Sequence, residues 1–158
     1  MKKIALTTLL GLILACGSSE KKKEKFEYKR VQVETKADSK NTSTTPIDMD
    51  NPGIGPIQNF EFPESIDQSL VSRGAATFKQ KCTACHQPNA RLIGPAMTGI
   101  YERRNPAWVL NIMLNPTQML KEDPIGKALL QEYNNVLMLN QNLSQEEARA
   151  LAEYFRTL

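Results

Sequence analysis

Two cysteines and the only histidine of the chain lie together in the run Cys82-Thr83-Ala84-Cys85-His86. Two thiols separated by two residues can form a redox-active disulfide, can bind zinc, or can add to the two vinyl groups of a porphyrin. An imidazole directly after the second thiol can also ligate an iron held beside it. The spacing C-x-x-C-H therefore limits this site to three kinds of chemistry.

Covalent attachment of a c-type haem is the chemistry that the rest of the sequence favours. A thioredoxin-like redox pair needs a βαβ context, and no strand-type alternation surrounds the motif. A zinc site needs more ligands than two cysteines and one histidine, and the chain has no other cluster of soft ligands. Cys82 and Cys85 are thus predicted to form thioether bonds to one haem, with His86 as the proximal iron ligand.

The third cysteine, Cys16, ends the N-terminal run MKKIALTTLLGLILAC. Two lysines precede an apolar stretch that is shorter than the ~20 residues of a membrane span, which is typical of a signal peptide. The last four residues, ILAC, resemble the lipobox of bacterial lipoproteins, which implies cleavage after residue 15 and a lipid anchor on Cys16. The alternative is a plain cleaved signal that contains a cysteine. Both interpretations place the mature protein outside the cytoplasm.

The composition changes sharply after residue 63. The whole chain has 158 residues, of which 41% are apolar, and this composition excludes a multi-pass membrane protein. Its formal charge of +3 gives no reason to expect nucleic-acid binding. Between residues 16 and 63, charged and polar runs alternate with prolines, and apolar residues are too sparse for a core. We therefore expect a signal peptide over residues 1–15, a flexible lipid-anchored tether over residues 16–63 and one domain over residues 64–158.

Helical periodicity runs through residues 64–158, so the fold class expected for this domain is all-α. Capping residues and prolines mark the helix starts, which are Asp67 or Ser69, Asn105-Pro106, Asp123-Pro124 and the capping box that begins at Ser144. Pro116 is expected to end the second helix. The last helix has an apolar stripe formed by Ala148, Leu151, Ala152 and Phe155. A domain of this size has a limited core, which a large apolar prosthetic group would complete.

Residues 67–158 resemble a class I monohaem cytochrome c. Gly74 and Phe78 precede Cys82 by eight and four positions, as in the N-terminal helix of that family. The resemblance implies that Gly74 crosses closely against the C-terminal helix, at Leu151 with Tyr154 or Phe155. It also implies that the carbonyl of Pro95, in Gly94-Pro95, accepts a hydrogen bond from the His86 ring.

The sixth iron ligand is expected to be a methionine. The chain has no second histidine, and a lysine outside the cytoplasm is normally protonated. The family pattern of methionine, short loop and C-terminal helix implies Met138, although Leu139 follows it where proline is common. Met119, expected in a connection between helices, stays open as the alternative. The other methionines are expected to be cleaved off, in the tether, too near His86 in sequence, or in a helix core: Met1, Met49, Met97 and Met113.

Histidine–methionine ligation favours ferrous iron and leaves no open coordination site, which indicates a one-electron carrier rather than an enzyme. Two alternatives remain: a haem-based small-ligand sensor with a labile Met138, and a docking protein whose haem is structural. The expected partners are a membrane, through the lipid anchor, and redox proteins. Two runs, IGPAMTGIYERRNPAWVLNIMLNP and NQNLSQEEARALAEYF, look similar to lipoprotein cytochromes c of nitrous oxide reduction in Gram-negative bacteria. That similarity implies a periplasmic location and a terminal reductase, such as nitrous oxide reductase, as a partner. Arg103-Arg104 is expected to be a solvated pair or a contact for an acidic partner.

Overall fold

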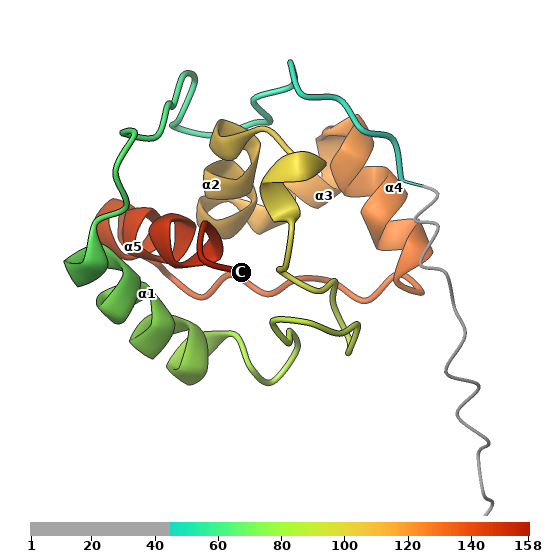
Figure 1. Cartoon of the computed structure of the whole chain (residues 1–158). Helices are drawn as coiled ribbons and strands as arrows, with labels where there is room; N and C mark the ends of the chain where they lie inside the picture. Colours follow the sequence, from blue (N-terminus) through green and yellow to red (C-terminus); the bar gives the residue numbers. More distant parts are fainter. Residues whose placement is uncertain (1–44) are drawn as a thin grey trace, which may run out of the picture. The chain divides into compact units, whose positions relative to one another are not determined.

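The computed structural model of the chain describes residues 45–158, and helices form the framework of this part. In chain order they are α1 (Gln68–Lys81), the 3-10 helix η1 (Ile100–Glu102), α2 (Pro106–Leu114), α3 (Pro116–Glu122), α4 (Pro124–Glu132) and α5 (Gln145–Phe155) (Figure 1). Within these residues, an isolated β-bridge between Asp48 and Arg104 is the only extended pairing. The all-α fold expected from the sequence is confirmed.

The first and last helices begin at capping residues that the sequence marks. The Asp67 carboxylate accepts hydrogen bonds from the N–H groups of Ser69 and Leu70, so Asp67 rather than Ser69 caps α1. At the start of α5, Ser144 and Glu147 form both hydrogen bonds of the capping box. Local sequence signals are therefore sufficient to position the beginnings of α1 and α5.

Prolines begin the three helices in the middle of the domain. Asn105 and Asp123 cap α2 and α4 as expected, each directly before a proline. The expectation that Pro116 only ends a helix, with Met119 in a connection, is wrong. Pro116 instead begins α3, and Met119 lies inside that helix. Because α3 has seven residues and the Asn115 side chain makes no capping bond, burial of its apolar side chains must stabilise it.

α1 and α5 cross in close contact, and a glycine makes this possible (Figure 1). A Cβ atom on Gly74 would lie 2.1 Å from the carbonyl oxygen of Ala150 and 2.8 Å from the Cβ of Tyr154. The expected close crossing of Gly74 is therefore present, but its nearest neighbour is the backbone of Ala150 rather than the Leu151 side chain. Leu151 is fully buried in the core, as the apolar stripe of α5 predicts. Phe78 of α1 packs against Tyr154, with ring centroids 5.6 Å apart.

The hydrophobic core lies where α2 packs against α5 and α3. Its buried members include Phe78, Trp108, Leu110, Met113, Met119, Ile125, Leu151 and Phe155. Because α2 is buried on most of its surface, the core continues from the α1–α5 pair to the α3–α4 pair. The axial-ligand candidates are thus attached to one connected framework.

The N-terminal strap, which we define as residues 45–63, packs along the helices and is not part of a tether. Ile54, Ile57, Phe60 and Phe62 contact the core cluster, and Phe62 packs edge-on against Tyr101 with ring centroids 4.9 Å apart. In Figure 1 the strap starts beside α4, runs past α3 and α2, and leads to the start of α1. The expected tether boundary at residue 63 is therefore wrong for residues 45–63. Four large apolar side chains of this otherwise polar segment pack against a core whose residues lie far from them in the sequence.

Asn111 of α2 holds the centre of the strap. Its side chain is fully buried, accepts a hydrogen bond from the Ile57 N–H at 3.0 Å, and donates to the carbonyls of Pro52 and Ile57 at 2.9 and 2.6 Å. A Cβ atom on Gly55 would lie 2.3 Å from the Asn111 Oδ1, so the strap backbone approaches too closely for a side chain. One buried amide thus satisfies three backbone groups of the strap.

Asp123 and Met119 attach the first half of the strap. The buried Asp123 carboxylate accepts hydrogen bonds from Trp108 Nε1 at 2.9 Å and from Asn51 Nδ2 at 2.8 Å. The Met119 sulfur accepts one from the Ile54 N–H at 2.9 Å. Because of these hydrogen bonds, the Asn51 amide and the Ile54 N–H of the strap have partners where the strap packs against the apolar core.

The expected signal peptide over residues 1–15, Cys16 and the first part of the expected tether lie outside the described residues. Among residues 45–158, no helix is both long enough and apolar enough to span a bilayer.

Candidate functional site

The C-x-x-C-H motif forms a tight turn at the end of α1. Cys82 caps the helix, and its N–H donates to the carbonyl of Phe78 at 2.9 Å. The N–H groups of Cys85 and His86 both donate to the carbonyl of Cys82, at 3.0 and 2.9 Å. This turn brings the two thiols and the imidazole together on a short, hydrogen-bonded piece of backbone.

The Cys82 thiol is not activated for redox exchange. Cys82 is half-buried, Cys85 is exposed, and no disulfide joins them. Burial raises the pKa of the Cys82 thiol to about 11, so this sulfur is protonated at neutral pH. Redox-active C-x-x-C pairs instead contain a thiol with a lowered pKa. The described residues also provide no strand next to the motif for a thioredoxin-like site.

The His86 ring is oriented by the carbonyl of Pro95. The distance between His86 Nδ1 and the Pro95 oxygen is 3.0 Å, and because a carbonyl can only accept, Nδ1 carries the proton. The lone pair of Nε2 is then available for a metal. Burial lowers the pKa of His86, and the hydrogen bond to Pro95 opposes this effect, so the ring is neutral at pH 7.

Gly94 allows the backbone to approach the imidazole. A Cβ atom at this position would lie 2.4 Å from His86 Cε1, well inside contact distance. The Gly94 N–H donates to the carbonyl of Cys85 at 2.8 Å, which closes the loop over the ring. The pair Gly94-Pro95 is thus part of the histidine site and not a simple turn.

Arg103 holds the same loop from the other side, and sequence reasoning did not identify it. Its guanidinium donates to the carbonyls of Ala96, Thr98 and Gly99 at 2.7, 2.9 and 2.8 Å. Burial lowers the pKa of Arg103, but arginine side chains stay charged in proteins. In the sequence, Arg103 appears only as part of the pair Arg103-Arg104. Nothing in the spacing of this pair indicates that Arg103 binds backbone carbonyls.

Arg104 is equally structural. It is 3% exposed, donates to the Pro46 carbonyl of the strap at 3.1 Å, and lies 5.6 Å from the ring centroid of Trp108. The expectation that Arg103-Arg104 is solvated or faces an acidic partner is therefore wrong. Both guanidiniums donate hydrogen bonds to backbone carbonyls of this domain.

The structure distinguishes Met138 from Met97, Met113 and Met119. Met138 lies on the non-helical segment between α4 and α5, is half-buried, and packs against the core. Met119 is fully buried within α3, and its sulfur accepts the Ile54 N–H. Met113 and Met97 are 6% and 8% exposed, in α2 and in the loop after His86. A fully buried, hydrogen-bonded thioether such as that of Met119 is poorly suited to ligate an iron.

The two segments that carry the candidate ligands also carry exposed apolar side chains. We call residues 82–99 the histidine segment and residues 133–144 the methionine segment. Leu92 and Ile93 are 44% and 47% exposed in the first, and Val136, Leu137 and Leu139 are 50–70% exposed in the second. Apolar surface of this kind, beside two thiols and one oriented imidazole, fits the faces of a porphyrin. The residues present therefore fit a covalent haem.

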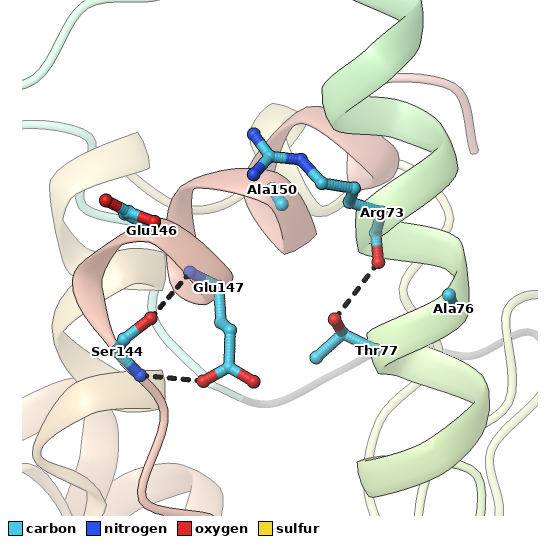
Figure 2. A pocket seen from close by; sticks show the side chains of 7 residues that line it. All are labelled: Arg73, Ala76, Thr77, Ser144, Glu146, Glu147 and Ala150. Carbon is cyan, nitrogen blue, oxygen red and sulfur yellow. Dashed lines mark hydrogen bonds between the residues drawn. The ribbon is translucent and has the colours of Figure 1, made fainter.

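Two further features of residues 45–158 do not form an alternative site. No group of three or more His, Cys, Asp or Glu side chains in this range is arranged to hold a metal ion. A groove between α1 and α5 is lined by Arg73, Ala76, Thr77, Ser144, Glu146, Glu147 and Ala150 (Figure 2). Its hydrogen bonds, from Thr77 to the Arg73 carbonyl and within the capping box, are internal to the two helices.

Comparisons with known proteins agree with this site. The sequence profile of the family described as cytochrome c matches residues 71–158. A cytochrome c from Rhodothermus marinus is 42% identical over 65% of this chain and 88% of its own, with a TM-score of 0.62. An engineered form of that protein is 41% identical over 65% and 89%, also with a TM-score of 0.62. No curated protein is significantly similar in sequence.

The matched residues contain the C-x-x-C-H turn, the Pro95 carbonyl, the α1–α5 crossing and the methionine segment. Family membership implies a covalently bound c-type haem with its iron, and haem-based electron transfer. With the family profile covering more than half of its length, the chain belongs to the cytochrome c family.

Proposed function

We propose that this protein is a one-electron carrier and not an enzyme, and that it passes electrons between membrane respiratory components and an extracytoplasmic redox partner. The observation that carries the proposal is the orientation of His86, whose Nδ1–H is held by Pro95 so that Nε2 is available to iron. As the only histidine of the chain, it leaves a thioether as the soft ligand for the opposite side.

In this proposal Cys82 and Cys85 hold the haem through thioether bonds, and His86 and Met138 are the axial ligands. When bound, the haem supplies an iron that gains and loses one electron. The chain supplies the rest: Pro95 and Gly94 fix the imidazole plane, Arg103 fixes their loop, and the methionine segment would supply the Met138 thioether on the opposite side. Because both ligands are held by the protein, little rearrangement accompanies electron transfer, and no position is open for a substrate.

The test of axial ligation compares two methionine variants of the holoprotein. Met138→Ala should remove the weak thioether-to-iron absorption at the red end of the oxidised spectrum, allow carbon monoxide to bind the reduced protein, and lower the reduction potential. Met119→Ala is the matched control: it should leave the ligation unchanged and destabilise the fold by about 2–5 kcal/mol, because Met119 is fully buried. Rapid carbon monoxide binding by the unmodified protein, unchanged in Met138→Ala, would replace the carrier proposal with a ligand-binding or sensor role.

The anchor and location follow from the N-terminal sequence. We infer that Cys16 carries lipid and places the domain on the periplasmic side of a membrane, and the extracytoplasmic assembly of bacterial cytochromes c supports this location. Cys16→Ser should move the protein from the membrane to the soluble fraction with an unchanged visible spectrum. A variant that stays on membranes after a salt wash would show that the uncleaved apolar N-terminus is the anchor instead.

For the electron acceptor we propose a terminal reductase such as nitrous oxide reductase, on the similarity of the two runs given above. Basic and acidic residues nearly balance in residues 64–158, so contact is expected to depend weakly on ionic strength. The reduced protein should transfer electrons to that enzyme in stopped-flow mixing, and membrane pull-downs with the lipidated protein should recover its donor. No transfer above the rate of a non-cognate cytochrome would remove this acceptor.

A further inference from the structure

One side chain connects the histidine segment to the helix end from which the methionine segment starts. The Arg91 Nη2 donates a hydrogen bond to the carbonyl oxygen of Glu132 at 2.8 Å. The same guanidinium lies over the ring of Tyr133, with its Cζ 4.1 Å from the ring centroid. Arg91 therefore binds the last residue of α4 through its backbone and the C-cap residue through its ring.

The backbone directly after this contact is held in an unusual conformation. Asn134 and Asn135 have φ angles of 57° and 58°, in the left-handed region, which asparagine tolerates better than most residues. The Asn135 N–H donates to the carbonyl of Leu130 at 2.7 Å, so the turn is fastened to α4. Met138 follows Asn135 by three residues. The direction of the chain at the end of α4 therefore determines where Met138 lies.

The other end of the connection is also fixed. Arg91 follows His86 by five residues, and next to it the Leu92 N–H donates to the carbonyl of Gly94 at 3.1 Å. Gly94 is in turn bonded to Cys85, inside the haem-attachment motif. Arg91 thus joins a loop that is anchored at the proximal ligand to a turn that leads to the candidate distal ligand.

We propose that Arg91 is a positioning residue that connects the histidine segment to the start of the methionine segment and thereby keeps Met138 on the iron. The inference rests on the proposed ligation by Met138. It assigns Arg91 no contact with the haem. Its effect is on the equilibrium between a closed methionine segment and one that has moved away from the iron. Loss of Arg91 increases the open fraction, which is the fraction to which an external ligand binds.

The experiment uses the holoprotein with Arg91→Ala, Arg91→Lys, Tyr133→Leu and the control Arg73→Ala. Arg73 is an exposed arginine on α1, at the groove of Figure 2. The groove also includes Ser144, the last residue of the methionine segment, but Arg73 does not contact Arg91, Glu132 or Tyr133, so its removal changes the net charge equally and leaves the Arg91 contact in place. Three quantities are measured: the rate of carbon monoxide binding to the reduced protein, the thioether-to-iron absorption of the oxidised protein, and amide hydrogen exchange of residues 133–139.

Arg91→Ala should bind carbon monoxide about five- to tenfold faster, because a charged hydrogen bond and a cation–π contact are lost together. Tyr133→Leu and Arg91→Lys should give smaller increases, since each retains part of the contact. Amide exchange of residues 133–139 should rise in the same order, and Arg73→Ala should match the unmodified protein in all three measurements.

Unchanged binding and unchanged amide exchange in Arg91→Ala would overturn the inference while Met138→Ala still opens the iron. If Met138→Ala itself changes nothing, the proposed ligation fails, and amide exchange alone then decides whether Arg91 holds this turn. Should Arg91→Ala assemble no holoprotein, the Tyr133→Leu and Arg91→Lys variants decide: rates equal to Arg73→Ala in both would overturn the inference.

Discussion

The strap and the two ligand-bearing segments cover opposite edges of the same helices in Figure 1 and are stabilised in different ways. On the strap side, buried polar side chains pair with strap groups: Asn111 and Asp123 are at most 2% exposed and make hydrogen bonds to Ile57 and Asn51. The histidine and methionine segments expose five large apolar side chains, up to 70% for Leu139, whereas the strap exposes two, Ile47 and Met49. The strap thus packs against the helices of its own domain, whereas the histidine and methionine segments carry apolar surface that would fit a porphyrin.

This difference indicates that two parts of the domain are stabilised in different ways. Around Asn111 and Trp108 the protein buries its own surface, so that region should tolerate changes in haem ligation. The histidine and methionine segments have no regular secondary structure over most of their length and depend on Arg103, Arg91 and Pro95 for their position. Variants on the two sides should therefore separate stability from spectroscopic properties.

The largest effect is expected at the haem-attachment motif. Cys82→Ser with Cys85→Ser removes both thioether bonds, so holoprotein should not accumulate. The measurement is peroxidase staining of haem on denaturing gels, supported by acid–acetone extraction, after which the unmodified polypeptide should retain its haem. Cys16→Ser, which changes the cysteine outside the motif, is the control and should stain normally. Haem that extracts freely from the unmodified protein would contradict covalent attachment.

The buried carboxylate of α5 should show the largest stability effect outside the motif. Glu153 is fully buried, accepts the Asp67 N–H at 3.0 Å, and forms ion pairs with Arg149 and Arg156. Glu153→Gln leaves two arginines without their carboxylate and should lower the free energy of unfolding of the holoprotein by about 3–5 kcal/mol. Denaturant titration measures this loss, with the exposed Glu146→Gln on the same helix as the control.

The same carboxylate predicts a pH dependence. Burial raises the pKa of Glu153, but the Asp67 N–H and the two arginines outweigh it, so the pKa lies below its ordinary value of 4.5. Its stabilising contribution is then complete above the unfolded pKa and is lost as the pH falls through the folded one. Unfolding free energies of the unmodified protein should fall in acid below about pH 4.5 more steeply than those of Glu153→Gln. Parallel pH profiles for the two proteins would contradict this assignment.

A smaller loss is expected when the strap is loosened. Asn111→Ala leaves the Ile57 N–H and the Pro52 and Ile57 carbonyls without their partner and should cost about 2–4 kcal/mol. Limited proteolysis should cut within residues 45–63, while the haem spectrum and carbon monoxide binding stay unchanged. A changed axial-ligand spectrum in this variant would show that the strap and the ligand segments are coupled, which would break the comparison.

Gly94→Ala is the counterpart on the ligand side, with the smallest expected cost in stability. The added Cβ would lie 2.4 Å from the His86 ring, which must tilt and weaken its hydrogen bond to Pro95. Overpacking of this kind costs about 1–3 kcal/mol, and a less basic imidazole should raise the reduction potential. Redox titration should compare the reduction potential of Gly94→Ala with that of Asn111→Ala, which should equal the potential of the unmodified protein. Equal potentials in both variants would show that Gly94 does not position the ligand.

Most helix starts of the domain could be predicted because their causes are local. Asp67, Asn105, Asp123 and Ser144 cap helices through bonds to N–H groups two or three residues away, so sequence spacing is sufficient. The short α3 has no such cap and forms because Met119 and Leu120 are buried against other elements. Its stabilising contacts are distant in the chain, which is why the sequence indicated only a connection.

The sequence by itself predicted the chemistry: two thiols and one imidazole at C-x-x-C-H spacing indicate a covalent haem, which membership of the cytochrome c family supports, and they make His86 the expected proximal ligand. The tertiary structure decided what lies around it. Arg103 reaches three carbonyls of the histidine segment, Arg91 reaches the end of α4, and Asn111 binds a strap more than fifty residues away in the chain. A side chain's hydrogen-bond partners depend on which backbone folds against it. An exposed arginine without a partner and one that donates to several backbone carbonyls therefore look the same in the sequence.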